Sequence, residues 1–391
     1  MALTGLPDLP LGPPDGLVDE LDALGRRFGL DGVALLGERA AVMGLWRRGQ
    51  TSCGGSCRLF PARSGREWLA VSLPRDDDME AVPAWLELDA PMPTTAPVTW
   101  SAVGDALASA TDHDTLVARA ELFGLPVARV GEVVDGGDQG VTRVRLGEAE
   151  PTARGAEGLL VVDLSSLWAG PLCGDLLAGA GARVVKVESV TRPDGARRGP
   201  AAFFDLLNGR KRSVALDFAS PSDVDILRQL VRRADVVIEA SRPRALEQLG
   251  IRAADVVRRG GPQVWVSITG YGRSAAAGRV AFGDDAAAAG GLVVWHDGAP
   301  LFCADAVADP VTGLRAAAAC LDVLESGGRW LLDVAMAGVC ARLAGPTVVA
   351  PDGSGPAAVA EPRARDAVAA APELGADTAE VVAELGLETS A

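Results

Sequence analysis

The sequence predicts an α/β protein that combines a Rossmann-like, mostly parallel sheet domain with a smaller α+β domain. From Leu159 onward, continuous apolar segments such as LLVVDL, VVKVE, DVVIEA and QVWVSITG alternate with amphipathic segments such as SDVDILRQLVRRA. Apolar strands that alternate with helices are typical of a parallel sheet covered by helices on both faces. Before that point the chain holds short helical patterns that Pro and Gly interrupt, which indicates a different and smaller unit.

These patterns divide the 391 residues into four regions. Residues 1–150 form the smaller domain, with a helix predicted in DGLVDELDALGRRFG and a strand in REWLAVSLP. Residues 151–158 are predicted to be a linker, because they are polar and lack periodicity. Residues 159–345 form the Rossmann-like domain, and residues 346–391 form a connector that ends in an amphipathic helix within PELGADTAEVVAELGL.

The composition disfavours several kinds of partner. A formal net charge of −15 and a pI near 4.7 argue against nucleic acid, since phosphate binding relies on clustered Lys and Arg. No apolar run has the length of a membrane span, and MALTGLPDLPLGPPDG lacks the features of a signal peptide. We therefore expect no membrane partner.

The cysteines and histidines argue against a disulfide framework and against a metal site. The six cysteines are scattered and mostly lie in apolar runs, which predicts buried free thiols and a cytoplasmic protein. Cys53 and Cys57 have no second cysteine pair to complete a zinc site, and the only histidines are His113 and His296. No metal is predicted.

The segment ADPVTGLRAAAACLDVL contains the candidate nucleophile, Asp309. The segment has the pattern of a helix that begins at this aspartate, with Pro310 directly behind it. Asp is a favoured N-cap and Pro is favoured in the first turn, so the local pattern alone favours a purely structural role for Asp309. A carboxylate near a helix N-terminus also stays ionised, which suits a nucleophile. The two roles are compatible.

Six segments in register resemble the class III CoA-transferases, the CaiB/BaiF group. They are VVDLSSLWAGPLCGDLLAGAGARVVKVES, LLNGRKRSVALDF, ADVVIEASRPRALEQLGI, VWVSITGYG, FGDDAAAAGG and ADPVTGLRAAAACLDVL. Residues from about Ala40 to Val144 resemble the segment that normally follows the nucleophile helix in this family. Here that segment precedes the sheet domain, so the chain resembles a member with rearranged segment order.

The resemblance implies a transfer of CoA from an acyl-CoA to a small carboxylate. In the implied mechanism Asp309 forms an acyl–aspartyl anhydride and then an aspartyl–CoA thioester. Gly54 and Gly55 in TSCGGSC resemble the family's glycine loop, whose backbone N–H groups stabilise developing negative charge. An ordinary turn before a strand explains the same residues. Asp284 occupies a position where transferases commonly carry an acid, although a solvated loop charge is the alternative.

The resemblance also implies a set of CoA contacts. The turn NGRK holds cationic side chains that suit a phosphate, although such runs are mostly solvated surface. The contacts that the register implies are Trp168, Ala169, Arg192, Asn208, Gly209, Arg210, Lys211, Gln248, Tyr271 and Gly272. At Trp168 the family often carries Gln, and at Gln248 it often carries Arg, so several CoA contacts differ in this chain.

Two alternatives remain besides transfer. An α-methylacyl-CoA racemase of the same fold carries a histidine just before the acidic loop residue, where this chain has Gly283 before Asp284. A catalytically weak acyl-CoA-binding or scaffold protein fits the altered CoA contacts but not the intact DPVTG segment. The resemblance further implies a homodimer, interlocked in the family, with the site between subunits. The acyl group and the acceptor acid cannot be predicted.

Overall fold

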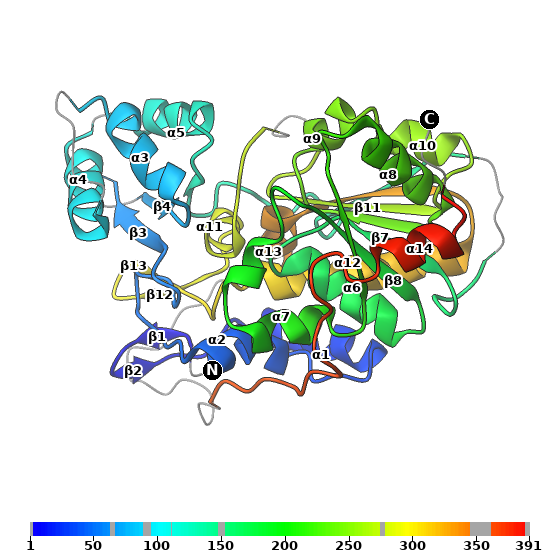
Figure 1. The fold of residues 1–391 in the computed structure, drawn as a ribbon. Coiled ribbons are helices and arrows are strands. Elements are labelled where there is room, and N and C mark those ends of the chain that lie inside the picture. Colours follow the sequence, from blue (N-terminus) through cyan, green and yellow to red (C-terminus); the bar gives the residue numbers. More distant parts are fainter. Residues whose placement is uncertain are drawn as a thin grey trace.

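The main body of the protein is a seven-stranded sheet with helices on both faces (Figure 1). The computed structural model describes residues 3–62, 67–88, 95–110, 112–147, 153–273, 278–344 and 361–387. Along the sheet the strands are β6 (Val141–Arg145), β14 (Trp330–Ala335), β11 (Val264–Thr269), β10 (Val236–Glu239), β7 (Leu160–Asp163), β8 (Arg183–Ser189) and β9 (Arg212–Leu216). Neighbouring strands run parallel except at the edge, where β6 pairs antiparallel with β14. The predicted mostly parallel α/β fold is confirmed.

The strands form where the sequence is continuously apolar, because both faces of the sheet are covered. One face packs on α1 (Asp15–Arg27), α6 (Ala169–Gly179), α12 (Ala308–Ser326) and α13 (Met336–Leu343). The other face packs on α8 (Pro221–Arg233), α9 (Pro243–Gln248), α10 (Ala253–Arg258) and α14 (Thr378–Glu384). The predicted terminal helix is thus α14, and it lies beside β9.

The smaller unit is an antiparallel three-stranded sheet with its own core. Its strands are β3 (Cys57–Pro61), β4 (Trp68–Ser72) and β5 (Val127–Arg129). Its helices are α3 (Asp76–Trp85), α4 (Ala96–Ser109) and α5 (His113–Leu122), which enclose a separate apolar cluster that includes Trp85 and Trp100. Figure 1 shows this unit in blue and cyan beside the large sheet.

The division of the chain at residue 150 stays a prediction. Two elements that precede this residue pack with the large sheet. Helix α1 packs against α12, and β6 belongs to the large sheet, although both precede residue 150. Their apolar side chains, such as Leu17 and Val141, join the core of the large sheet. Only residues from about Cys57 to Arg129 form the separate antiparallel unit.

The remaining elements are shorter. They are β1 (Gly5–Leu6), β2 (Leu9–Pro10), η1 (Ala34–Gly37), α2 (Glu38–Met43), η2 (Gly195–Arg198), α7 (Ala201–Asn208), α11 (Gly283–Ala289), β12 (Val293–His296) and β13 (Ala299–Phe302). Helix α11 contacts β4 and β5 on one side and α13 on the other, so it links the antiparallel unit to the large sheet. Residues 361–377 then run without regular structure to α14, while residues 346–360 of the predicted connector and residues 151 and 152 of the predicted linker lie outside the described residues.

The six cysteines are free and buried, as predicted. Among the described residues, none of the helices combines the length and the apolar character needed to cross a lipid bilayer. Within the same residues no group of three His, Cys, Asp or Glu side chains is arranged to hold a metal ion.

Candidate active site

Asp309 lies in the first turn of α12, at the carboxyl edge of the large sheet. The helix begins at Ala308 with Val307 as its N-cap, so Asp309 is inside the helix and the prediction that it caps the helix is wrong by two residues. Its carboxylate accepts a hydrogen bond from the backbone N–H of Ala169, the first residue of α6, which follows β7. Two helix N-termini therefore meet at one partly exposed carboxylate, and both favour its anionic form.

Two buried acids and one arginine lie around the carboxylate of Asp309. Asp305 is fully buried, and its two oxygens accept hydrogen bonds from Nε and Nη2 of Arg39 at 2.8 and 2.6 Å. Asp284, in the first turn of α11, is 7% exposed and accepts from the backbone N–H of Ala306 at 3.0 Å and from the Ser52 hydroxyl. Sequence reasoning missed Asp305, Arg39 and Ser52.

Burial and like charges raise the pKa values of these carboxyls. Burial raises the pKa of Asp309 to about 7, the charge of Arg39 opposes this shift, and the charge of Asp284 adds to it. Burial, together with the charge of Asp305, raises the pKa of Asp284 to about 6. Burial therefore makes the carboxylate of Asp309 more basic than a fully solvated one.

The predicted glycine loop lies beside this cluster. It is a tight turn in which the N–H of Gly55 donates to the carbonyl of Ser52 at 2.9 Å, and Gly55 has a left-handed φ of +82°. A side chain at Gly54 would begin 3.4 Å from Nη2 of Arg39. Of the four predicted catalytic residues, Asp309, Asp284 and Gly54 lie around Arg39, whereas a side chain at Gly55 would meet Arg48.

The backbone around the cluster is strained. Ala304 and Ala306, on either side of Asp305, have φ values of 58° and 44°, and Leu167, just before Trp168, has a φ of 70°. Non-glycine residues in this conformation cost about 1–3 kcal/mol each and persist only where surrounding structure holds them. The N–H of Ala304 donates to the buried hydroxyl of Thr4 at 3.1 Å, so the N-terminal hairpin helps to hold Asp305 in place.

The side chains of the predicted CoA turn after α7 lie partly in the interior and partly at the surface. Nδ2 of Asn208, which is buried, donates to the carbonyl of Phe204 at 3.1 Å, and Gly209 lies so close to the carbonyl of Ala369 that a side chain there would overlap it. Arg210 is exposed and its Nε lies 3.2 Å from Asp175. The C-terminal segment covers part of this turn.

The prediction that Lys211 contacts a phosphate of CoA needs a correction. Its ammonium is buried, and it donates to Oδ2 of Asp163 at 2.8 Å and to the carbonyl of Pro171 at 2.7 Å. A phosphate at this ammonium would have to replace a buried carboxylate. The strand β9 begins at the next residue, and this turn directs Lys211 into the protein while Arg210 stays outside.

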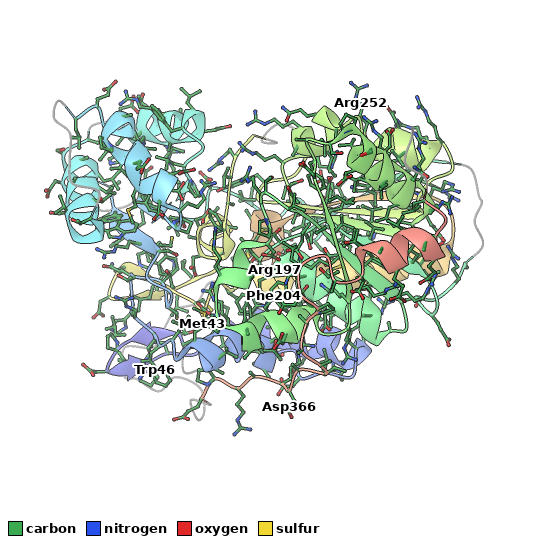
Figure 2. All side chains as sticks on the ribbon, in the orientation of Figure 1. Met43, Trp46, Arg197, Phe204, Arg252 and Asp366 are labelled. Atoms are coloured by element: carbon green, nitrogen blue, oxygen red, sulfur yellow. The ribbon has the colours of Figure 1, made fainter. Side chains whose placement is uncertain are left out.

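Arg197 in the loop before α7 is similarly engaged. It donates to both oxygens of Glu188, and its guanidinium lies over the ring of Phe204, 4.4 Å from the ring centre. The labels of Arg197 and Phe204 lie next to each other in Figure 2. The remaining predicted CoA residues take different positions. Trp168 is buried against Phe203, and Gln248 is exposed at the end of α9.

Tyr271 and Gly272 follow β11 at the carboxyl edge of the sheet. The Tyr271 hydroxyl accepts from Arg279 at 3.1 Å, and Gly272 has a φ of +93°, which favours glycine. Both residues lie on the edge where ligands of parallel sheets usually bind.

A group of arginines lies at the same edge, and sequence reasoning found only one of them. Arg192 follows β8, and Arg242 and Arg244 follow β10; all three are exposed. Partial burial lowers the pKa of Arg242, and the charges of Arg244, Arg75 and Arg192 add to this shift. Because like charges have been brought together in a chain of net charge −15, the group suits a polyanion.

Two cavities lie elsewhere in the described part of the chain. One of about 410 Å³ is lined by residues of α8, α9 and α10, and one of about 650 Å³ lies among α3, α4 and α5. Neither includes Asp309.

Comparison with known proteins identifies relatives of this chain. The model of CoA-transferase family III matches residues 157–376. A formyl-CoA:oxalate CoA-transferase of Streptomyces coelicolor is 34% identical over 187 residues, which cover 44% of each protein. A succinate–glutarate CoA-transferase of Agrobacterium fabrum is 31% identical over 201 residues, which cover 46% of this chain and 50% of that relative.

The chain spans about half the length of these curated relatives. Among solved structures, a CaiB/BaiF family protein from Brucella suis is 30% identical, covers 49% of this chain and 55% of that one, and superposes with a TM-score of 0.44. The residues that the family model matches include six of the seven strands of the large sheet and α12.

Proposed function

Because this chain belongs to CoA-transferase family III, we propose that it moves CoA from an acyl-CoA donor to a small carboxylate acceptor, with Asp309 as the nucleophile. The observation that carries this proposal is the partly exposed carboxylate of Asp309, which two helix N-termini face and whose pKa burial raises to about 7. The relatives named as CoA-transferases act on CoA esters, which is consistent with this role.

The proposed transfer proceeds through two intermediates on Asp309. A carboxylate oxygen attacks the thioester carbonyl, the carbon–sulfur bond breaks, and CoA leaves as a thiolate from an acyl–aspartyl anhydride. The thiolate then attacks the aspartyl carbonyl, and the original acyl group leaves as a carboxylate. An acceptor carboxylate attacks the resulting thioester to form a second anhydride, and the released thiolate takes the acceptor's acyl group and restores Asp309. The N–H group of Gly54 would stabilise the oxyanions, whereas the N–H group of Gly55 is already bound to the Ser52 carbonyl.

The arginines Arg192, Arg242 and Arg244 are proposed to hold the phosphates of CoA. They lie in loops after the strands of the large sheet, on the edge that carries Asp309. Arginine forks match phosphate oxygens well, and this group has an excess of positive charge. Arg210 is not included in this group, because it lies before the amino end of β9 and its Nε lies 3.2 Å from Asp175.

We also propose that the protein acts as a cytoplasmic homodimer. Free buried thiols favour a reducing compartment. The homodimer is what the resemblance to the family implies. Light scattering tests this point, and a monomer at working concentration would refute it.

The transfer is tested with acyl-CoA and candidate carboxylates, comparing wild type with Asp309→Asn. The matched control is Asp322→Asn, an exposed aspartate on the same helix. We expect CoA transfer and a covalent adduct on Asp309 by intact-mass spectrometry in wild type and in the control, and neither in Asp309→Asn. Substrate α-proton exchange without CoA movement would instead indicate a racemase, and saturable binding without turnover would indicate a binding protein.

The CoA contact is tested separately with Arg242→Gln, with Arg26→Gln as control. Arg26 is exposed on α1, which packs on the opposite face of the large sheet from α9. We expect a higher KM for the acyl-CoA only in Arg242→Gln, and an unchanged KM would contradict the proposed phosphate site.

A further inference from the structure

Arg39 lies beside three parts of the candidate site, which are the buried acids, the glycine turn and the start of α6. It lies on the short helix α2, and its guanidinium is fixed by two hydrogen bonds to Asp305. The same guanidinium lies 5.5 Å from the ring centre of Trp168 and faces Gly54. A single side chain thus joins the buried acids, the glycine turn and the start of α6.

Helix α2 is itself held in place. Glu38, the neighbour of Arg39, is buried and accepts from Nε of Arg365 at 2.8 Å, and Arg365 also donates to Asp175 on α6. Because both the helix and the guanidinium are tied to the large domain, Arg39 has little freedom to turn away from Asp309.

The charges that act on Asp309 come from every element packed around it. Asp284 on α11 and Asp305 before α12 are acids, Cys340 on α13 is a buried thiol, and α6 contributes the amide of Ala169. Among these described groups, Arg39 on α2 is the cation. Without it, three carboxyls would share one buried region with no opposite charge.

We propose that Arg39, fixed by Asp305, is a positioning residue that holds Asp309 as an anion facing the glycine turn. This inference rests on the proposed nucleophilic role of Asp309. The bidentate pair explains why the acid at position 305 is fully buried, since the fork of an arginine satisfies both of its oxygens. A lysine at position 39 would keep the charge but lose one of the two bonds.

Arg39 acts on the carboxyl of Asp309 as well as neutralising Asp305. The effect of Arg39 on the carboxyl of Asp309 exceeds the opposing effect of Asp305. Removing the charges of Arg39 and Asp305 together therefore raises the pKa of Asp309 above its wild-type value. If Arg39 and Asp305 only neutralised each other, the double variant would leave the pKa of Asp309 unchanged.

The test compares Arg39→Gln, Arg39→Lys and the double variant Arg39→Gln/Asp305→Asn, with Arg252→Gln as control. The readout is the titration of the Asp309 carboxyl by carbon-13 NMR, assigned with Asp309→Asn, together with the pH profile of kcat/KM. We expect wild type to lose activity below about pH 7, on the acidic limb of its pH profile. In Arg39→Gln we expect this limb and the titration of the Asp309 carboxyl to move upward by about one pH unit or more.

The other variants separate a positioning role from a structural one. We expect Arg39→Lys to restore the position of the limb at a reduced kcat, and the double variant to fold stably with a smaller upward shift. An unchanged Asp309 titration in folded Arg39→Gln or in the double variant would overturn the inference. A shifted titration in a protein that never transfers CoA would support the role of Arg39 and refute the proposed function, so the two failures can be told apart.

Discussion

Gly283 offers a direct steric test of where Asp309 must lie. This glycine opens α11, and a methyl group in its place would overlap Oδ2 of Asp309 and lie 2.6 Å from the carbonyl oxygen of Ala306 and 2.8 Å from its Cβ. Ordinary van der Waals contact begins at 3.4 Å. The Asp309 carboxylate must therefore retreat by about 1 Å, and a misplacement of that size lowers kcat by about 10²-fold.

The Gly283→Ala variant is compared with Gly179→Ala, a glycine at the end of α6 where an added methyl meets nothing within 4 Å. Steady-state CoA transfer gives kcat, and urea unfolding gives the free energy of unfolding. We expect Gly283→Ala to lose about 1–3 kcal/mol through overpacking yet remain folded. A folded variant with wild-type kcat would refute the position assigned to Asp309.

Two further predictions concern buried charges. Lys211→Met removes the ammonium that pairs with the buried carboxylate of Asp163 and leaves it, within the described residues, only Ser165 as a hydrogen-bond donor and the charge of Lys186. The free energy of unfolding in urea should therefore fall by about 3–5 kcal/mol; a higher KM for CoA at unchanged stability would instead support a phosphate contact. Burial raises the pKa of Asp285, which accepts from Ser72 at 2.7 Å, to about 8. Because the folded state keeps this proton to a higher pH than the unfolded state, wild-type stability should fall as pH rises from about 4 to 8, by up to about 1.4 kcal/mol per pH unit for this group. Asp285→Asn should remove that slope in urea titrations at pH 6 and pH 8, and an equal slope in both proteins would contradict the assignment.

The sequence predicts the large sheet well, because its strands are buried on both faces and therefore read as continuous apolar runs. β7, β8, β10 and β11 all form within the predicted segments. β6 could not be assigned in the same way. Its sequence VTRVR is mostly exposed, and nothing in such a pattern says which of two sheets an edge strand joins.

The candidate site is predicted in part, and the reasons for the omissions are physical. Asp309 and Asp284 lie in motifs that span many residues, so register identifies them. Arg39 lies on a six-residue helix with no distinctive pattern, and its role depends on Asp305, a contact between residues far apart in the chain. Long-range pairs of this kind leave no local signal.

The run GRKR shows a second limit. Four successive residues suggest one basic surface, yet the structure sends Arg210 outward and Lys211 into a buried pair with Asp163. The direction of each side chain depends on where the turn ends and β9 begins, and composition alone does not fix that residue.

The antiparallel edge strand β6 has a consequence for how the chain folds during its synthesis. β6 and α1 leave the ribosome long before β14 and α12, the elements they pack against. The nascent chain therefore carries an unpaired strand edge and an uncovered apolar helix face until most of the protein has been made, and both promote aggregation. The antiparallel unit of β3, β4 and β5 pairs locally and needs no later segment for its own core. Premature termination before Trp330 would thus release fragments in which the antiparallel unit is folded and the rest of the chain is prone to aggregate. The segments that chaperones would need to protect are α1 and β6.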